Sequence, residues 1–233
     1  MINKLLTNNS IKIGEGATSI VYRVENCYSH KGFLCLKILK DFIIQKANVE
    51  EKKQDNKSFW EEDSIERKEV EIEFDFEKVK SFYIEFEILR KLNHPNIIET
   101  YGFFLGDKNT NPAILLEYCR SNLEKAINKL EDFELVGVIY EICSAMKHIH
   151  ELKIIHRDLK MTNILLNLKK HVKICDFGIA RQIDVSTFTS LTHGIGTLAF
   201  MAPELFDENV KYNEKVDVYS FGVVMYFIVT KGS

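Results

Sequence analysis

The sequence predicts an α+β protein, with a mainly β first half that contains one helix and a mainly α second half. Two observations lead to this prediction. Short apolar or alternating runs, which are typical of strands, recur within residues 11–39 and 97–118. After residue 119, apolar residues recur at spacings of three and four, as expected for helices with one buried face.

The composition indicates an ordinary globular protein, with no electrostatic argument for binding nucleic acid or an anionic membrane. Of the 233 residues, 45% are hydrophobic and 28% are charged, and the formal net charge is −3. The five cysteines are scattered without paired metal spacing, so we expect reduced thiols and a cytoplasmic location. We expect no membrane segment and no signal peptide, because the apolar runs suit neither.

Residues 11–24 predict a strand, a turn and a second strand, because apolar and polar residues alternate around the stretch Gly14-Glu15-Gly16-Ala17-Thr18-Ser19. A third, buried strand is expected at residues 33–39, an apolar run broken only by Lys37. A buried ammonium is costly, so Lys37 needs an anionic partner. The alternative is a lysine at a strand edge whose side chain reaches water.

Residues 41–75 differ in composition from the rest of the chain. They contain 12 Asp and Glu against 6 Lys and Arg, a net charge of −6 that leaves +3 for the remainder. With little apolar periodicity, this segment is typical of a solvated insertion that is disordered in part. A tolerated surface loop is favoured over a partner-binding segment.

The remaining elements follow from periodicity. A helix is expected over residues 76–92, ending before His94-Pro95, because Pro disfavours helix at the preceding residue. Strands are expected at residues 97–105 and 113–118, around the turn 106–112. A long helix is expected over residues 135–151. Its apolar stripe is Val138, Ile142, Ala145, Met146 and Ile149.

The second half holds two strings of chemistry-bearing residues. His156-Arg157-Asp158-Leu159-Lys160-Met161-Thr162-Asn163 places an Asp, a Lys and an Asn close together, and Asp176-Phe177-Gly178 follows shortly downstream. Phosphoryl transfer needs a group that orients a hydroxyl, a cation for the moving phosphate and oxygen ligands for Mg²⁺. These residue types supply all three. The two strings in this order and spacing therefore indicate phosphoryl transfer, although each acidic residue alone would be an ordinary surface charge.

On these strings the chain resembles the eukaryotic protein kinases. The resemblance covers roughly residues 10–230 outside the 41–75 insertion. It implies a bilobal kinase-like fold, with a small antiparallel β lobe at residues 1–117, a larger helical lobe at residues 118–233, and ATP and Mg²⁺ bound between them. The implied roles are Asp158 as the base that orients the hydroxyl and Lys160 as the cation for the phosphate. Asn163 and Asp176 are the implied Mg²⁺ ligands.

The resemblance extends to the nucleotide site. Gly14-x-Gly16-x-x-Ser19-x-Val21 matches the phosphate-binding loop, although Ser19 replaces a usual Gly and a plain two-Gly hairpin is the alternative. Leu34-Cys35-Leu36-Lys37 matches the strand whose Lys pairs with a helical Glu, here Glu85 and not its competitor Glu87. Glu117-Tyr118-Cys119 resembles the hinge that binds the adenine edge. The implied nucleotide-binding residues are Ile13, Gly14, Gly16, Ser19, Val21, Cys35, Lys37, Glu85, Glu117, Cys119 and Leu165.

The resemblance also implies the substrate class. Leu159-Lys160-x-x-Asn163, with Gly196-Thr197, resembles Ser/Thr kinases, whereas Asp217-Val218-Tyr219-Ser220-Phe221-Gly222 looks like the tyrosine-kinase-like group. The implied function is transfer of the ATP γ-phosphate to Ser or Thr of protein substrates. An impaired pseudokinase or scaffold that still binds nucleotide is the alternative. A small-molecule kinase is a third, against which Met201-Ala202-Pro203-Glu204 argues, because this segment docks a peptide in the family.

Three features qualify the match. The hydroxyls between residues 186 and 197, near Arg157, suggest activation by phosphorylation, because phosphate pairs well with Arg. A flexible polar loop is the alternative and is about equally good for any single site. Thr100 stands where kinases usually place an apolar residue beside the Glu85 helix. The span 216–230 is apolar on almost every side and must be enclosed. In kinases further helices cover it, so we expect a C-terminally truncated domain whose larger lobe lacks its last helices.

Overall fold

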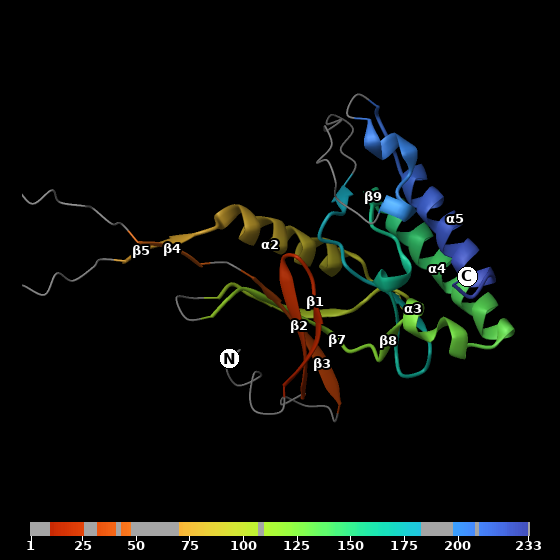
Figure 1. The fold of residues 1–233 in the computed structure, drawn as a ribbon, viewed down its shortest axis with the longest axis horizontal. Helices are drawn as coiled ribbons and strands as arrows, with labels where there is room; N and C mark the ends of the chain where they lie inside the picture. The colour runs from red at the N-terminus through yellow and green to blue at the C-terminus, as the bar shows by residue number, and fades with distance from the viewer. Residues whose placement is uncertain are drawn as a thin grey trace, which may run out of the picture.

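An antiparallel five-stranded sheet and one long helix make up the first half of the chain (Figure 1). The computed structural model describes residues 10–25, 32–40, 43–47, 70–106, 110–182, 198–207 and 210–232. The strand order is β1-β2-β3-β7-β6, and the predicted strands and helix are confirmed to within a few residues. The elements are β1 (Ile11–Glu15), β2 (Ser19–Glu25), β3 (Phe33–Leu39), α2 (Phe76–Lys91), β6 (Thr100–Phe104) and β7 (Ala113–Glu117).

Strand β3 lies in the middle of the sheet, which explains its apolar sequence. It pairs with β2 on one side and β7 on the other, so Lys37 lies opposite Val21 and Ile114. A central strand has neighbours along both edges. Lys37 therefore has no strand edge from which to reach water, and its ammonium needs a partner within the protein.

Helix α2 begins at a capped position and packs one face on the sheet. The side chain of Asp75 accepts a hydrogen bond from the backbone N–H of Lys78 at 3.1 Å, which satisfies one of the free amides of the first turn. Phe82 packs against Phe103 of β6 with ring centroids 6.1 Å apart. The buried residues of the helix are Val79, Phe82, Glu85, Ile88 and Leu89.

The ends of the 41–75 segment form a two-stranded ribbon, which the sequence did not predict within this solvated and partly disordered insertion. β4 (Ile43–Ala47) and β5 (Val70–Phe74) pair antiparallel, with Ile43 opposite Phe74 and Ala47 opposite Val70. β-Branched and aromatic residues, which favour strands, occur at both ends of the segment. The net charge of the whole segment did not reveal these strand-forming residues at its two ends. Residues 41–42 and 48–69 lie outside the described residues.

The second half is built on two long helices that lie side by side, α4 (Asp132–Glu151) and α5 (Lys215–Val229) (Figure 1). The predicted helices at 135–151 and 216–230 are confirmed. Helix α4 begins earlier than expected because Glu131 and Glu134 form a capping box, in which the Glu134 carboxylate accepts from the Glu131 N–H at 2.9 Å. The short elements are β8 (Ser121–Asn122), α3 (Leu123–Ala126), β9 (Ile154–Ile155), η2 (Met161–Asn163), β10 (Ile164–Leu166), β11 (Val172–Ile174), β12 (Arg181–Gln182), η3 (Leu198–Phe200) and η4 (Pro203–Phe206).

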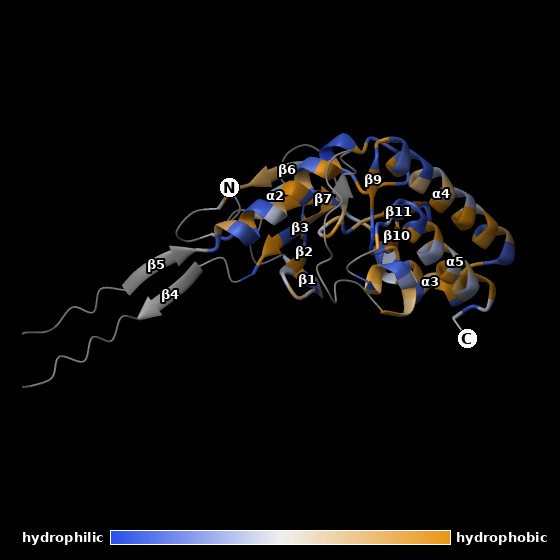
Figure 2. Cartoon of the chain, turned by 90° about the horizontal axis from the view of Figure 1, so that it is seen from above, coloured by the Kyte–Doolittle hydropathy of each residue, from blue (hydrophilic) through white to orange (hydrophobic). Residues whose placement is uncertain are grey.

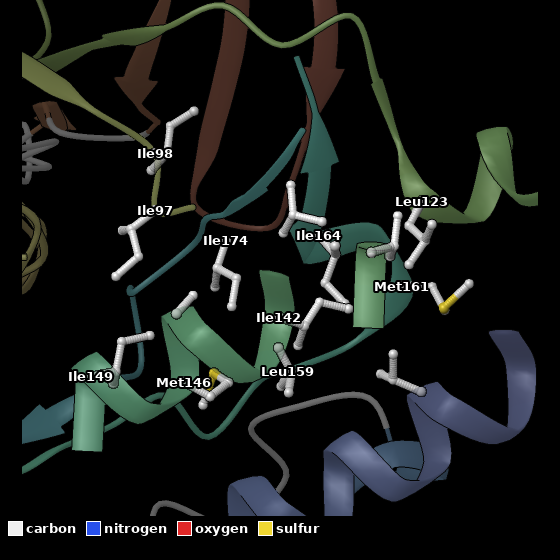
Figure 3. Packing of buried hydrophobic residues seen from close by; sticks show 14 of the residues in the cluster. Ile97, Ile98, Leu123, Ile142, Met146, Ile149, Leu159, Met161, Ile164 and Ile174 are labelled. Carbon is white, nitrogen blue, oxygen red and sulfur yellow. The ribbon is translucent and has the colours of Figure 1, made fainter. Parts of the chain in front are cut away.

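The largest hydrophobic core lies between α4 and the short strands that follow it. Every member of the predicted α4 stripe is buried, and Ile142 and Ile149 are 0% exposed. Figure 3 shows Ile142, Met146 and Ile149 on the side of α4 that faces β10 and β11. The same cluster includes Leu89 of α2 and Phe177, so one continuous core extends from the first half of the chain into the second.

Backbone hydrogen bonds join the two halves behind this core. Ile98 donates to the Ile174 carbonyl at 2.9 Å, and Ile174 donates to the Asn96 carbonyl at 2.9 Å. The unusual Thr100 also finds a partner, because its hydroxyl donates to the Leu115 carbonyl at 3.2 Å. A satisfied hydroxyl costs little in a partly buried position. The segment 96–100 therefore connects β11 to the sheet without an unpaired polar side chain at Thr100.

Helix α5 is largely apolar (Figure 2), and within the described residues one of its faces is buried while the other is exposed. Its buried residues include Val216, Val224 and Ile228, whereas Tyr226 is 61% and Val229 is 73% exposed. Because a helix that is hydrophobic all round is normally enclosed, the second face remains available for contact. None of the described helices combines the length and apolar character needed to cross a membrane.

The α4 core makes a direct stability prediction. Ile142→Ala should lower the free energy of unfolding by about 2–5 kcal/mol, because the substitution leaves a cavity at a site with no exposed surface. Chemical denaturation followed by circular dichroism measures this. Tyr140→Ala on the same helix, at a residue that is 74% exposed, is the control and should change stability by about 0.5 kcal/mol or less. Equal losses in the two variants would contradict this core.

Candidate active site

A cavity of about 490 Å³ opens between the five-stranded sheet and the segments that follow β7. Its wall contains every residue that the sequence implied for nucleotide binding, from Ile13 in β1 to Leu165 in β10, together with Asn163 and Asp176. The side chains of Asp158 and Lys160 are not part of this wall. The cavity wall also contains residues that were not assigned to it from the sequence, among them Arg120, Ser121, Asn122, Lys125, Thr162 and Cys175.

Lys37 is bound by two carboxylates at one end of the cavity. Its Nζ lies 2.6 Å from Oε1 of Glu85 and 3.1 Å from Oδ1 of Asp176. Burial by itself would lower the pKa of Lys37, but the two carboxylates outweigh burial and raise it above its ordinary value. The ammonium in turn lowers the pKa of Asp176, against the opposing effect of burial.

Glu85 is the buried member of this group, with a side chain 4% exposed. Burial raises its pKa, and the ammonium of Lys37 opposes that rise. Glu87, the competitor in sequence, lies on another face of α2 and pairs with Arg90 at 3.0 Å. The helical period therefore decides which glutamate reaches Lys37, because residues two apart do not share a face.

The segment 158–163 brings a carboxylate, an ammonium and an amide together. The Oδ2 atom of Asp158 accepts hydrogen bonds from Lys160 Nζ at 2.8 Å and from Asn163 Nδ2 at 2.9 Å. Asn163 Nδ2 also donates to the Asp158 backbone carbonyl at 2.9 Å. These bonds orient the Asp158 side chain, and the second carboxylate oxygen, Oδ1, is a further acceptor that a hydroxyl could use.

Asp217 of α5 forms hydrogen bonds with the two residues that directly precede Asp158, a role that was not predicted from the sequence. Its Oδ1 accepts from the Arg157 backbone N–H at 2.8 Å, and its Oδ2 accepts from the His156 backbone N–H at 2.9 Å. Oδ2 also contacts His150 Nε2 at 2.8 Å. The signal in the sequence was a single Asp in an otherwise apolar helix, because a buried carboxylate must be hydrogen-bonded.

His156 and Phe177 pack together and orient the chain around them. Their rings lie 4.7 Å apart, and Phe177 is 1% exposed. His156 Nδ1 accepts from the Asp158 backbone N–H at 3.2 Å, so its Nε2 carries the proton and donates to the Cys175 carbonyl at 3.1 Å. This bond ties the segment of Asp158 to the residue that precedes Asp176.

Three cysteines line the cavity, and their thiols are protonated. Burial raises the pKa of the Cys35 thiol to about 11 and that of the Cys119 thiol to about 12. The pKa of Cys175 is also raised by burial. A protonated thiol is a poor nucleophile, so these side chains act as packing groups.

The hydroxyl-rich residues Ser186, Thr187, Thr189, Ser190, Thr192 and Thr197 lie outside the described residues. Arg157, which was expected to meet a phosphate there, has other partners in this structure. Its Nε donates to the Ile179 carbonyl at 2.6 Å, and its Nη1 donates to the hydroxyl of Tyr212 at 3.1 Å. The guanidinium therefore connects the residues after Phe177 with those before α5.

The oxygen atoms of Asn163 and Asp176 suit a hard divalent cation. Mg²⁺ is commonly held by one or two protein oxygens, with waters and substrate phosphates completing the octahedron. Within the described part of the chain, no group of three or more His, Cys, Asp and Glu side chains is arranged to hold a metal by itself.

Comparisons with known proteins agree on one family. The protein kinase domain family matches residues 7–233. A probable serine/threonine-protein kinase of Dictyostelium discoideum is 37% identical over 166 residues, which are 66% of this chain and 12% of that protein. Serine/threonine-protein kinase CTR1 of Arabidopsis thaliana is 36% identical over 172 residues, 69% of this chain and 20% of that protein. Mitogen-activated protein kinase kinase kinase dlk-1 of Caenorhabditis elegans is 39% identical over 153 residues, 63% of this chain and 16% of that protein.

The chain thus spans a fifth or less of the length of these relatives.

The buried ion pair makes a pH-dependent prediction. Lys37→Met should cost about 3–5 kcal/mol near neutral pH, because it leaves the Glu85 carboxylate buried without its cation. Removing the ammonium raises the pKa of Glu85 further. The folded variant then holds a proton that the unfolded chain releases, so its stability should fall as pH rises above the ordinary glutamate value of about 4.3.

Urea denaturation at pH 5 and pH 8 measures this effect. The double variant Lys37→Met, Glu85→Gln is the matched control, since it removes the uncompensated carboxylate along with the ammonium. We expect the double variant to regain most of the lost stability and to lose the pH dependence. An equal loss at both pH values, or no recovery in the double variant, would argue against a buried pair.

Proposed function

This chain belongs to the protein kinase domain family, and we propose that it transfers the γ-phosphate of ATP to Ser and Thr hydroxyls of protein substrates. The observation that carries the proposal is the meeting of Lys37, Glu85 and Asp176 at one cavity with Asn163, which is hydrogen-bonded to Asp158. These groups come from four separate parts of the sequence, and each matches a need of phosphoryl transfer.

We assign the roles as follows. Lys37 binds the α- and β-phosphates, with Glu85 holding its ammonium in place. Asp158 orients the substrate hydroxyl and accepts its proton, and Lys160 neutralises charge on the moving phosphate. Mg²⁺, when bound by Asn163 and Asp176, supplies further positive charge on the phosphate oxygens. The mutual hydrogen bonds of Asp158, Lys160 and Asn163 support these roles, because they orient the groups before substrate arrives.

The adenine is assigned to the inner part of the cavity, between Val21, Cys35 and Leu165. A cavity of about 490 Å³ suits a ligand of this size. The backbone of Glu117 and Cys119 supplies the polar edge, and the phosphates extend toward Gly14, Gly16 and Ser19. In this proposal residues 1–117 form the nucleotide-binding lobe and residues 118–233 carry the catalytic segment.

Ser/Thr specificity rests on Lys160 and on the relatives, whose names describe serine/threonine-protein kinases. The tyrosine-kinase-like group is proposed from the string that begins at Asp217. A cytoplasmic location is also proposed, on the basis that Cys35, Cys119, Cys143 and Cys175 are free thiols.

The proposal predicts that Asp158→Asn lowers the transfer rate to a protein substrate by about 10²–10⁴-fold, because the amide cannot take the hydroxyl proton. Nucleotide affinity should remain, since the Asp158 side chain lies outside the cavity wall. The rate is measured with labelled ATP and Mg²⁺ on a generic protein, and affinity is measured by thermal shift. Asp132→Asn, at an exposed carboxylate paired with Lys231, is the control.

Phosphoamino-acid analysis of the product should give phosphoserine and phosphothreonine. Phosphotyrosine as the main product would contradict the assigned specificity. Nucleotide binding without any transfer by the unsubstituted protein would favour a scaffold that binds nucleotide over a catalyst.

A further inference from the structure

Lys40, directly after β3, reaches back to the glycine-rich turn between β1 and β2. Its Nζ donates to the Gly16 carbonyl at 2.9 Å and also contacts Oε1 of Glu15. Its backbone N–H donates to the Thr18 carbonyl at 2.8 Å. One residue therefore contacts the turn at three places, Glu15, Gly16 and Thr18. Lys40 was not singled out by any sequence motif, and it does not line the cavity.

The carboxylate of Glu15 strengthens this arrangement. It is shared between Lys12 of β1 and Lys40, and hydrogen bonds from these two lysines lower the pKa of Glu15 to about 2. Glu15 is therefore ionised at every physiological pH. The Glu15 carboxylate is thus bound by Lys12, within the same hairpin, and by Lys40, which directly follows β3.

The contact with Gly16 fixes the direction of one peptide group. In a trans peptide the carbonyl and the following N–H point in opposite directions. When the Gly16 oxygen is held by Lys40, the Ala17 N–H must point away from Lys40. A backbone N–H with a fixed direction at the tip of such a turn is a suitable donor for a phosphate oxygen.

We propose that Lys40 is a positioning residue for the phosphate-binding turn, fixing the peptide between Gly16 and Ala17 and tying it to the strand that carries Lys37. This inference rests on the proposed function, because it assigns the turn to the phosphates of ATP. The turn is then attached to the C-terminal end of β3, the strand that carries Lys37. It is therefore held in place before nucleotide binds.

The size of the effect follows from the exposure of the groups. Exposed ion pairs contribute little to global stability, so Lys40→Met should leave the melting temperature almost unchanged. The orientation of the turn is affected more directly. We expect Lys40→Met to weaken the binding of a non-hydrolysable ATP analogue with Mg²⁺ by about two- to fivefold. The KM for ATP should rise by a similar factor, while kcat and the KM for protein substrate stay unchanged.

Two variants make the comparison specific. Lys40→Arg keeps a cation on the strand and should restore most of the affinity. Lys12→Met removes the other lysine on Glu15 and leaves the Gly16 carbonyl contact in place, so affinity should change by less than about 1.5-fold. Isothermal titration calorimetry of the whole chain measures all four proteins.

Hydrogen exchange at residues 14–19 tests the positioning without any nucleotide. Exchange should be faster in Lys40→Met than in the unsubstituted protein or in Lys12→Met. Unchanged exchange would overturn the proposal, as would faster exchange with unchanged affinity for the analogue. If the unsubstituted protein bound no analogue at all, the proposed function would fail. The exchange experiment would then decide by itself whether Lys40 holds the turn.

Discussion

The ammonium of Lys37 is the group on which the arrangement of the cleft depends. It lies on a central strand and is bound by a carboxylate from α2 and a carboxylate that follows β11. A buried charge must be paired, so the protein reaches its low-energy state only when the sheet, the helix and the Asp176 segment are together. The same contact that satisfies the lysine therefore sets the relative position of three groups that line the cavity, Lys37, Glu85 and Asp176.

A second buried carboxylate, Asp217, fixes the backbone that precedes Asp158, as Glu85 fixes the ammonium of Lys37. Asp217 accepts hydrogen bonds from the backbone N–H groups of His156 and Arg157. Arg157 has a positive φ of 64°. A left-handed conformation costs free energy in a residue other than glycine, and it persists where surrounding bonds determine it. The position of Asp158 thus depends on a helix that is distant in sequence, and α5 contributes to the site without lining it.

Local patterns predicted most of the fold, because strand and helix periods are written in neighbouring residues. The residues around the cavity were implied by the resemblance of short motifs to the protein kinases. The parts that escaped prediction depend on distant contacts. Neither the partners of Asp217 nor the contact from Lys40 to Gly16 has a local pattern. The β4–β5 ribbon was missed for another reason, since its two strands are separated by charged residues that dominated the composition.

The contacts of Arg157 constrain how a phosphate could act on this site. Its guanidinium already donates to the Ile179 carbonyl and to Tyr212, and both are neutral acceptors. A phosphate offers charged oxygens, which form stronger hydrogen bonds with arginine than a carbonyl or a hydroxyl does. A phosphorylated residue arriving here would therefore compete for donors that now connect the Asp176 segment to the start of α5.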